Sequence, residues 1–94
     1  MSIEVRIPTI LRPHTGGKKL VTGAGMTLRE LVVDLESRHT GLAGRLIDGD
    51  VASGSLRRFI NIYVNDEDVR FTGGLETPVV DGDSVTVLPA VAGG

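Results

Sequence analysis

The apolar positions of this chain follow two different periods. The segments IEVRI at residues 3–7 and FINIYV at residues 59–64 alternate apolar and polar or outward-facing side chains. A period of two is typical of a strand with one buried face. From Leu28 onward, apolar residues recur at the i, i+3, i+4 and i+7 spacing of an amphipathic helix. The pattern therefore predicts several strands and one main helix.

The predicted helix has start and stop signals in the sequence. Thr27 is a good N-cap, and Glu30 stands three residues later, as in a capping box. Gly41 is expected to end the helix near His39. The segment LAGRLI at residues 42–47 predicts one further short helical turn.

The remaining segments predict short strands joined by turns. KKLVT at residues 18–22 is expected to form an antiparallel hairpin with residues 3–7. Residues 48–58 are polar and rich in Gly and Ser, which predicts a mobile surface loop. Beyond residue 64 we expect a turn at NDED, a short return strand at VRF and a final strand at SVTVLP.

The order of the elements is strand, strand, helix and then strands. Such an order predicts an α+β fold with a mixed sheet of about four to five strands and one main helix packed on one face. A right-handed crossover would place a later strand parallel to the first. This is the β-grasp (ubiquitin-like) arrangement. We expect one domain over residues 1–89 and a flexible, extended tail over residues 90–94.

Composition narrows the function classes. Ten Lys and Arg face twelve Asp and Glu, so the net charge of −2 gives no electrostatic case for nucleic acid or membrane binding. The chain has no cysteine, which excludes disulfides and thiol catalysis. The first ten residues do not resemble a signal peptide, and no apolar stretch approaches the roughly 20 residues of a membrane helix. We therefore expect a small cytoplasmic protein.

The motifs that suggest bound groups fail on spacing. GAGMTL before the helix lacks the third glycine of a dinucleotide-binding loop, because Leu28 stands there. DGDVA and DEDVR lack a third oxygen ligand of a calcium loop, at Ala52 and Arg70. His14 and His39 have no close spacing partner. We expect no bound metal or cofactor and no catalytic group, so the chain is not expected to be an enzyme.

Three large apolar residues are expected on the uncovered face of the sheet. If Val85 and Val87 face the helix, alternation turns Leu88 outward. The same argument places Phe59 and Tyr63 on the face opposite the helix. A patch of this kind suggests a docking surface for a partner. The alternative is that these are isolated surface residues of the ordinary kind.

The last five residues are the small side chains Ala90, Val91, Ala92, Gly93 and Gly94. Fully extended, they reach roughly 16–18 Å, and two residues without Cβ can enter a narrow channel. A terminal carboxylate is a poor electrophile and must be activated, usually by ATP, before it accepts sulfur, a thiol or an amine. We interpret this tail as a segment that threads into a partner active site. The alternative is an inert terminus.

Three stretches resemble a known family: IPTILRPHTGG, NIYVNDEDVRFTGGL and DGDSVTVLPAVAGG. They resemble the ubiquitin-like sulfur carriers (the ThiS/MoaD family), which include the small subunit of molybdopterin synthase and the thiamin sulfur carrier. Within that family, the first two stretches are most similar to actinobacterial carriers of cysteine biosynthesis. The resemblance runs from about Ile7 to Gly94.

The resemblance implies a protein co-substrate with a thiocarboxylate at Gly94. It implies three partners: an E1-like adenylating and sulfurylating enzyme, a pyridoxal-phosphate cysteine synthase that uses O-phosphoserine, and a JAMM-type zinc metalloprotease. ATP, pyridoxal phosphate and zinc would then belong to those partners. The alternatives are sulfur delivery to molybdopterin or another thio-cofactor, a ubiquitin-like protein modifier, or a plain interaction domain.

Overall fold

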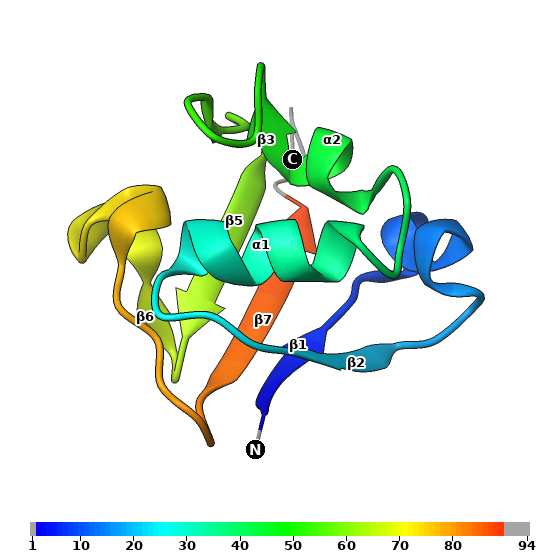
Figure 1. Cartoon of the computed structure of the whole chain (residues 1–94), viewed down its shortest axis with the longest axis horizontal. Coiled ribbons are helices and arrows are strands. Elements are labelled where there is room, and N and C mark those ends of the chain that lie inside the picture. The colour runs from blue at the N-terminus through cyan, green and yellow to red at the C-terminus, as the bar shows by residue number, and fades with distance from the viewer. Residues whose placement is uncertain (1, 90–94) are drawn as a thin grey trace.

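The structure, a computed structural model, describes residues 2–89, and in it α1 lies across one face of a five-stranded sheet (Figure 1). The strands are β1 (Ile3–Arg6), β2 (Leu20–Gly23), β3 (Ile47–Asp48), β4 (Ser55–Leu56), β5 (Ile60–Val64), β6 (Glu67–Asp68) and β7 (Ser84–Pro89). The helices are α1 (Leu28–Glu36) and α2 (Leu42–Leu46), and the 3-10 turns are η1 (Thr9–Thr15), η2 (Val69–Phe71) and η3 (Gly74–Glu76).

The main sheet has the strand order β2-β1-β7-β5-β6. β7 runs parallel to β1, with Val85 opposite Val5, and antiparallel to β5, with Val87 opposite Ile62. β1 and β2 form the predicted antiparallel hairpin. The mixed sheet, the parallel crossover and the β-grasp fold are therefore confirmed. β7 is the central strand, so both of its edges are paired.

The N-terminus of α1 is capped as the sequence predicts, with one difference. The Thr27 hydroxyl accepts a hydrogen bond from the Glu30 amide at 3.2 Å. The Glu30 carboxylate reaches back to the Met26 amide at 2.9 Å, one residue before the position of a standard capping box. The helix ends at Glu36, three residues before His39. Near that end the Ser37 hydroxyl donates to the carbonyl of Asp34 at 2.6 Å, a local bond of the kind that competes with the helix ladder.

Two glycines of the GAGMTL segment allow the chain to pass close to α1. A Cβ on Gly25 would lie 2.7 Å from the backbone nitrogen of Leu31, and one on Gly23 would lie 2.8 Å from the Leu31 side chain. Any larger residue at either position would force the helix or its side chains to shift. These glycines serve packing, which accounts for them without a bound nucleotide.

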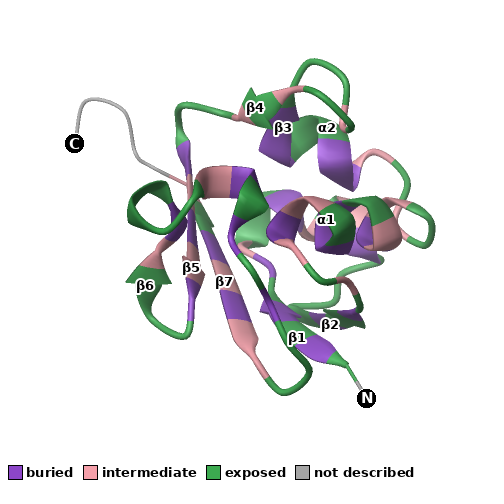
Figure 2. Cartoon of the chain, turned by 60° about the vertical axis from the view of Figure 1, so that its left-hand side comes forward, coloured by how far each residue is buried: buried purple, intermediate pink, exposed green. Residues whose placement is uncertain are grey.

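The core lies between α1 and the sheet, where β5 and β7 alternate buried residues with half-buried ones (Figure 2). The alternation predicted for β5 and β7 is confirmed, with Ile62, Val85 and Val87 at 1–2% exposure. Among residues 2–89, no helix is long and apolar enough to cross a membrane. The buried apolar residues are Ile3, Val5, Ile7, Leu11, Val21, Leu28, Leu31, Val32, Leu35, Leu42, Ala43, Leu46, Ile47, Ile60, Ile62, Val64, Val69, Leu75, Val79, Val85 and Val87.

The segment expected to be a surface loop, residues 48–58, contains a hairpin instead. β3 and β4 pair with Ile47 opposite Leu56. Arg29 holds the tip of this hairpin, because its guanidinium donates to the Val51 carbonyl at 2.9 Å. A Cβ on Gly54 would overlap the carbonyl oxygens of Asp48 and Asp50, so the turn requires glycine. Gly and Ser residues here mark a tight turn.

The predicted return strand at residues 69–71 is wrong by two residues. Asn65 and Asp66 have φ angles of 50° and 74°, which form a two-residue hairpin turn of the I′ kind. A turn that short brings the chain back into the sheet at once, so the return strand is β6 at residues 67–68. The Asp68 carboxylate then accepts from the Arg70 amide at 2.9 Å and starts η2.

Candidate functional site: the end of β7

The described part of the chain ends at Pro89, directly before the C-terminal segment of residues 90–94. Pro89 is the last residue of the central strand β7 and lies opposite Ile60, the first residue of β5. Proline has no amide hydrogen to offer the sheet, so it is a natural end for the strand. The predicted tail residues Ala90, Val91, Ala92, Gly93 and Gly94 lie outside the described residues. The site described here is therefore the surface around Pro89.

The structure exposes two of the three predicted docking residues and divides the three between two places. Leu88 is 45% exposed and Phe59 is 58% exposed, as alternation predicts, while Tyr63 is half-buried. Tyr63 and Leu88 line one hollow on the open face of the sheet, together with Asp66 and Thr86. Phe59 lies beyond the start of β5 and lines a different hollow. Their role in docking stays a prediction.

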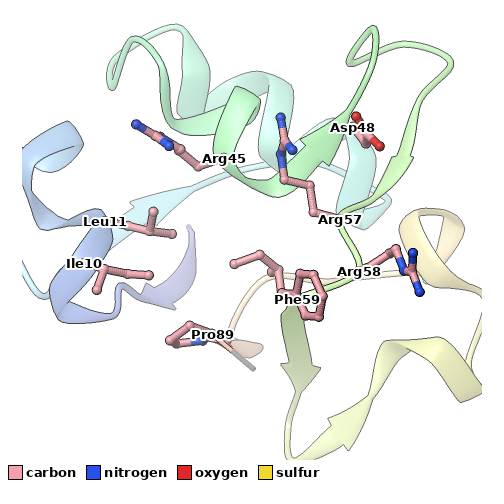
Figure 3. A pocket seen from close by; sticks show the side chains of 9 residues that line it. Ile10, Leu11, Arg45, Asp48, Arg57, Arg58, Phe59 and Pro89 are labelled. Carbon is pink, nitrogen blue, oxygen red and sulfur yellow. The ribbon is translucent and has the colours of Figure 1, made fainter. Parts of the chain in front are cut away.

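The second hollow is an open groove of about 610 Å³ beside Pro89. Figure 3 shows Ile10 of η1 and Phe59 on its two sides, with Pro89 at its base. The other lining residues are Leu11, Arg45, Asp48, Arg57, Arg58 and Ile60. Sequence reasoning missed the groove because its walls come from segments far apart in the chain. The Arg57–Arg58 pair just before β5 was the one local signal.

Hydrogen bonds and ring contacts place the three arginines of the groove. The Nε of Arg57 donates to the Gly44 carbonyl of α2 at 2.8 Å. The guanidinium carbon of Arg58 lies 6.0 Å from the centre of the Phe59 ring, at the limit of a cation–π contact. The Nε of Arg45 approaches Nε2 of His14 at 3.4 Å. All three arginine side chains are exposed.

Arg70 fixes the segment that carries Arg57, Arg58 and Phe59. Its guanidinium donates to the carbonyls of Ile60 at 2.7 Å, of Arg58 at 3.2 Å and of Arg57 at 3.3 Å. It also donates to the side-chain oxygen of Asn61. One side chain thus supplies hydrogen bonds to three backbone carbonyls at the start of β5.

Glu36 fixes the helix that carries Arg45. The two oxygens of its carboxylate accept hydrogen bonds from the amides of Gly41 at 2.9 Å and Ala43 at 2.8 Å. These two bonds, that from Gly41 first, lower the pKa of Glu36, and the charge of His14 adds to the effect. The carboxylate takes the place of a side-chain cap at the N-terminus of α2.

Positive charge gathers around the last two residues of β7. The groove beside Pro89 contains three arginines and one acidic residue, Asp48. A neighbouring hollow beside Leu88 contains Arg6, Arg12 and Lys19 and no acidic residue. Six of the ten Lys and Arg residues of the chain therefore line the two hollows at this end of the sheet.

The described part of the chain offers no centre for a bound metal. No group of three or more His, Asp or Glu side chains lies close enough to hold an ion within residues 2–89.

A β-grasp domain whose central strand leads directly into a small-residue tail defines the class of ubiquitin-like carriers and modifiers. Residues 5–94 match the ThiS family, and the chain belongs to that family. A relative of high identity is a sulfur carrier protein, and this chain is accordingly a small carrier protein rather than a catalyst. The predicted family is thereby confirmed.

The relatives cover the full chain. The sulfur carrier protein CysO of Mycobacterium tuberculosis is 61% identical over 94 residues, which span all of both chains. The crystal structure of the Amycolatopsis orientalis BexX/CysO complex contains a chain that is 59% identical, with a TM-score of 0.89 over 98% of this chain and 99% of that one. The small archaeal modifier protein 3 of Haloferax volcanii is 33% identical over 96 residues, which span all of both chains.

Proposed function

We propose that this sulfur carrier works through Gly94, whose carboxylate is adenylated and converted to a thiocarboxylate that supplies sulfide for cysteine biosynthesis from O-phosphoserine. The observation that carries the proposal is the full-length 61% identity to a sulfur carrier protein CysO. The fold supports it, because β7 is paired with a strand on each side and the tail residues follow β7 directly in the sequence.

In the proposed reaction, sulfur passes from a partner to the new cysteine by way of Gly94. The carboxylate of Gly94 attacks ATP, and an acyl-adenylate forms as pyrophosphate leaves. A sulfide equivalent from the sulfurylating partner then displaces AMP and leaves the thiocarboxylate. The sulfur replaces the phosphate of O-phosphoserine, giving a thioester to the new cysteine. The cysteine amine attacks the thioester carbonyl, and the resulting amide is hydrolysed to free cysteine and the original carboxylate.

The proposal assigns the bound groups to partner enzymes. An E1-like enzyme consumes the ATP, a pyridoxal-phosphate cysteine synthase handles O-phosphoserine, and a JAMM-type zinc metalloprotease releases cysteine. Because activation uses ATP, we place the carrier in the cytoplasm. The chain itself contributes an accessible carboxylate and a surface that positions it. Its lack of cysteine suits this role, since the transferable sulfur would be carried at one position.

Intact mass with O-phosphoserine tests the proposal. Thiocarboxylated chain, a competent synthase and O-phosphoserine should yield a chain heavier by one cysteine residue, attached by an amide bond to Gly94. The S-to-N shift is fast because the amine is held next to the thioester. Gly93→Val should slow this adduct even when sulfur is loaded chemically. If no cysteine is added and sulfur instead reaches a pterin precursor, the protein serves molybdopterin synthesis.

A modifier function is the second candidate, and the 33% identity to small archaeal modifier protein 3 favours it. In that case the activated Gly94 would form isopeptide bonds with lysine amines of other proteins. Recovery of Gly-Gly remnants on lysines of cellular proteins, without any thiocarboxylated chain, would support the modifier and contradict the cysteine route.

A further inference from the structure

The groove beside Pro89 has features that the proposed chemistry of the tail does not explain. Three guanidinium groups line it against a single carboxylate. Between them lie large apolar side chains in water, with Ile10 63% exposed and Phe59 58% exposed. Exposed apolar side chains that are rimmed by charged residues are typical of an interaction site.

Within residues 2–89, the three arginines of the groove form no ion pairs. Among residues 2–89, the ion pairs are Arg29 with Glu76 and Arg38 with Asp34, and neither involves the groove. Arg58 lies over the Phe59 ring at the limit of a cation–π contact, and Arg45 approaches the imidazole of His14. Arg70 and Glu36 hold the backbone beneath these side chains, so the groove is presented by fixed elements.

We propose that this groove is a second docking surface, distinct from the open-face hollow of Tyr63 and Leu88, and that it takes an acidic segment of the adenylating partner. The inference rests on the proposed function, because it takes the adenylating enzyme as the occupant. The bound segment carries carboxylates that meet Arg45 and Arg58, with an apolar side chain between them that covers Phe59 and Ile10.

Charge and position together select that occupant. A groove with three cations and one anion attracts an acidic surface and repels a basic one. Its base is Pro89, the last described residue before the tail. A partner that binds this groove therefore also binds next to the start of the tail, which must enter the partner's active site. Binding at the groove raises the effective concentration of the tail at that active site.

The test compares Arg58→Glu with Lys18→Glu in ATP–pyrophosphate exchange, using an E1-like enzyme that activates the wild-type chain. Both variants change the net charge equally, and Lys18 is exposed but does not line the groove. Arg58→Glu should raise the KM for the carrier by about tenfold or more at low salt and leave kcat unchanged, because the tail is intact. Lys18→Glu should have a much smaller effect, and Arg58→Lys should keep most of the wild-type KM.

Salt and ring variants sharpen the result. The KM effect of Arg58→Glu should shrink between 0.05 M and 1 M salt, since the Debye length falls to about 3 Å. Phe59→Ala should raise KM without this salt dependence, whereas Phe71→Ala, at an 87% exposed phenylalanine outside the groove, should not. Thermal unfolding of each variant checks that the fold is kept.

Three results would overturn the inference. One is an equal KM for Arg58→Glu and Lys18→Glu, and another is a KM effect of Arg58→Glu that persists unchanged at 1 M salt. The third is self-association of the wild-type chain that Arg58→Glu abolishes, which would assign the groove to a second copy. Absence of exchange with the wild-type chain would instead contradict the proposed function, so the two failures are distinguishable.

Discussion

The two ends of β7 carry opposite charges and use them differently. At the Pro89 end, six cations line two hollows around Leu88 and Pro89. At the Ser84 end, Asp66, Asp81 and Asp83 lie in the turns that precede β6 and β7. The net charge of −2 conceals this separation, because composition averages over it.

At the acidic end, Asp83 accepts hydrogen bonds from groups in the same turns. The Asp83 carboxylate accepts from the Val80 amide at 2.9 Å and from the Asn65 side chain at 2.9 Å, and the Asn65 oxygen accepts from the Ser84 amide at 3.0 Å. At the basic end, Arg45 and Arg58 face a groove instead. Charge that closes a turn stabilises the fold, and charge that faces a groove is available to a partner. The ends should therefore respond differently to mutation.

The largest expected effect is on binding, at the basic end. Leu88→Asp and Phe59→Asp should each weaken binding to the adenylating enzyme or the synthase by several kcal/mol, because an unpaired charge would be desolvated in the interface. Unfolding should change little, since both side chains are exposed. Titration calorimetry and thermal unfolding measure the two quantities. Loss of cooperative unfolding in both variants would contradict the assignment of the faces.

Removing Arg70 should affect both stability and binding. Arg70→Ala deletes four hydrogen bonds that hold residues 57–61, and the exposed position limits the loss in unfolding free energy to about 1–3 kcal/mol. Binding should weaken as well, because the groove loses its shape. Urea unfolding checks the first effect. A variant with unchanged stability and unchanged binding would show that the groove does not depend on Arg70.

Breaking the acidic end should affect stability alone. Asp83→Ala removes the acceptor for the Val80 amide and the Asn65 side chain, which should lower the unfolding free energy by about 1–2 kcal/mol. Partner affinity should stay close to that of the wild type. Asp81→Ala is the matched control in the same turn. A larger loss of affinity than of stability in Asp83→Ala would remove the distinction between the two ends.

The smallest expected effect is the acid dependence of the α2 cap. Because the folded pKa of Glu36 lies below its ordinary value of about 4.5, its contribution is complete above that ordinary pKa and is lost as the pH falls through the lower folded pKa. The contribution should stay below about 1 kcal/mol, because solvent still reaches this half-buried carboxylate and screens its charge. Glu36→Gln should flatten the stability curve in that window. An unchanged curve would show that the carboxylate charge is irrelevant.

Periodicity was sufficient to predict the fold of the main sheet. The alternation in β5 and β7 and the apolar stripe of α1 each follow from one buried face, so local pattern and tertiary packing agree. The predictions that were wrong concern segments whose structure is set by turn geometry. The positive φ angles of Asn65 and Asp66 make a two-residue turn, so the return strand begins earlier than predicted. The turn at Gly54 belongs to a hairpin where a loop was expected.

The site was predictable only in part. Exposure of Phe59 and Leu88 follows from alternation along single strands. The groove does not, because Ile10, Arg45 and Arg58 meet only after η1, α2 and the segment before β5 come together. The bonds of Arg70 that hold it join residues 9 to 13 positions apart across irregular backbone, where sequence carries no period.

Intact mass of the chain after incubation with ATP, a sulfide source and an E1-like sulfurylating enzyme tests the central claim most directly. The account predicts a product in which one oxygen is replaced by sulfur, with the exchange located at Gly94 by peptide sequencing. A variant with one residue appended after Gly94 should form no such product. Sulfur acceptance by the appended variant without prior trimming, or no exchange in the wild-type chain with a competent enzyme, would contradict the account.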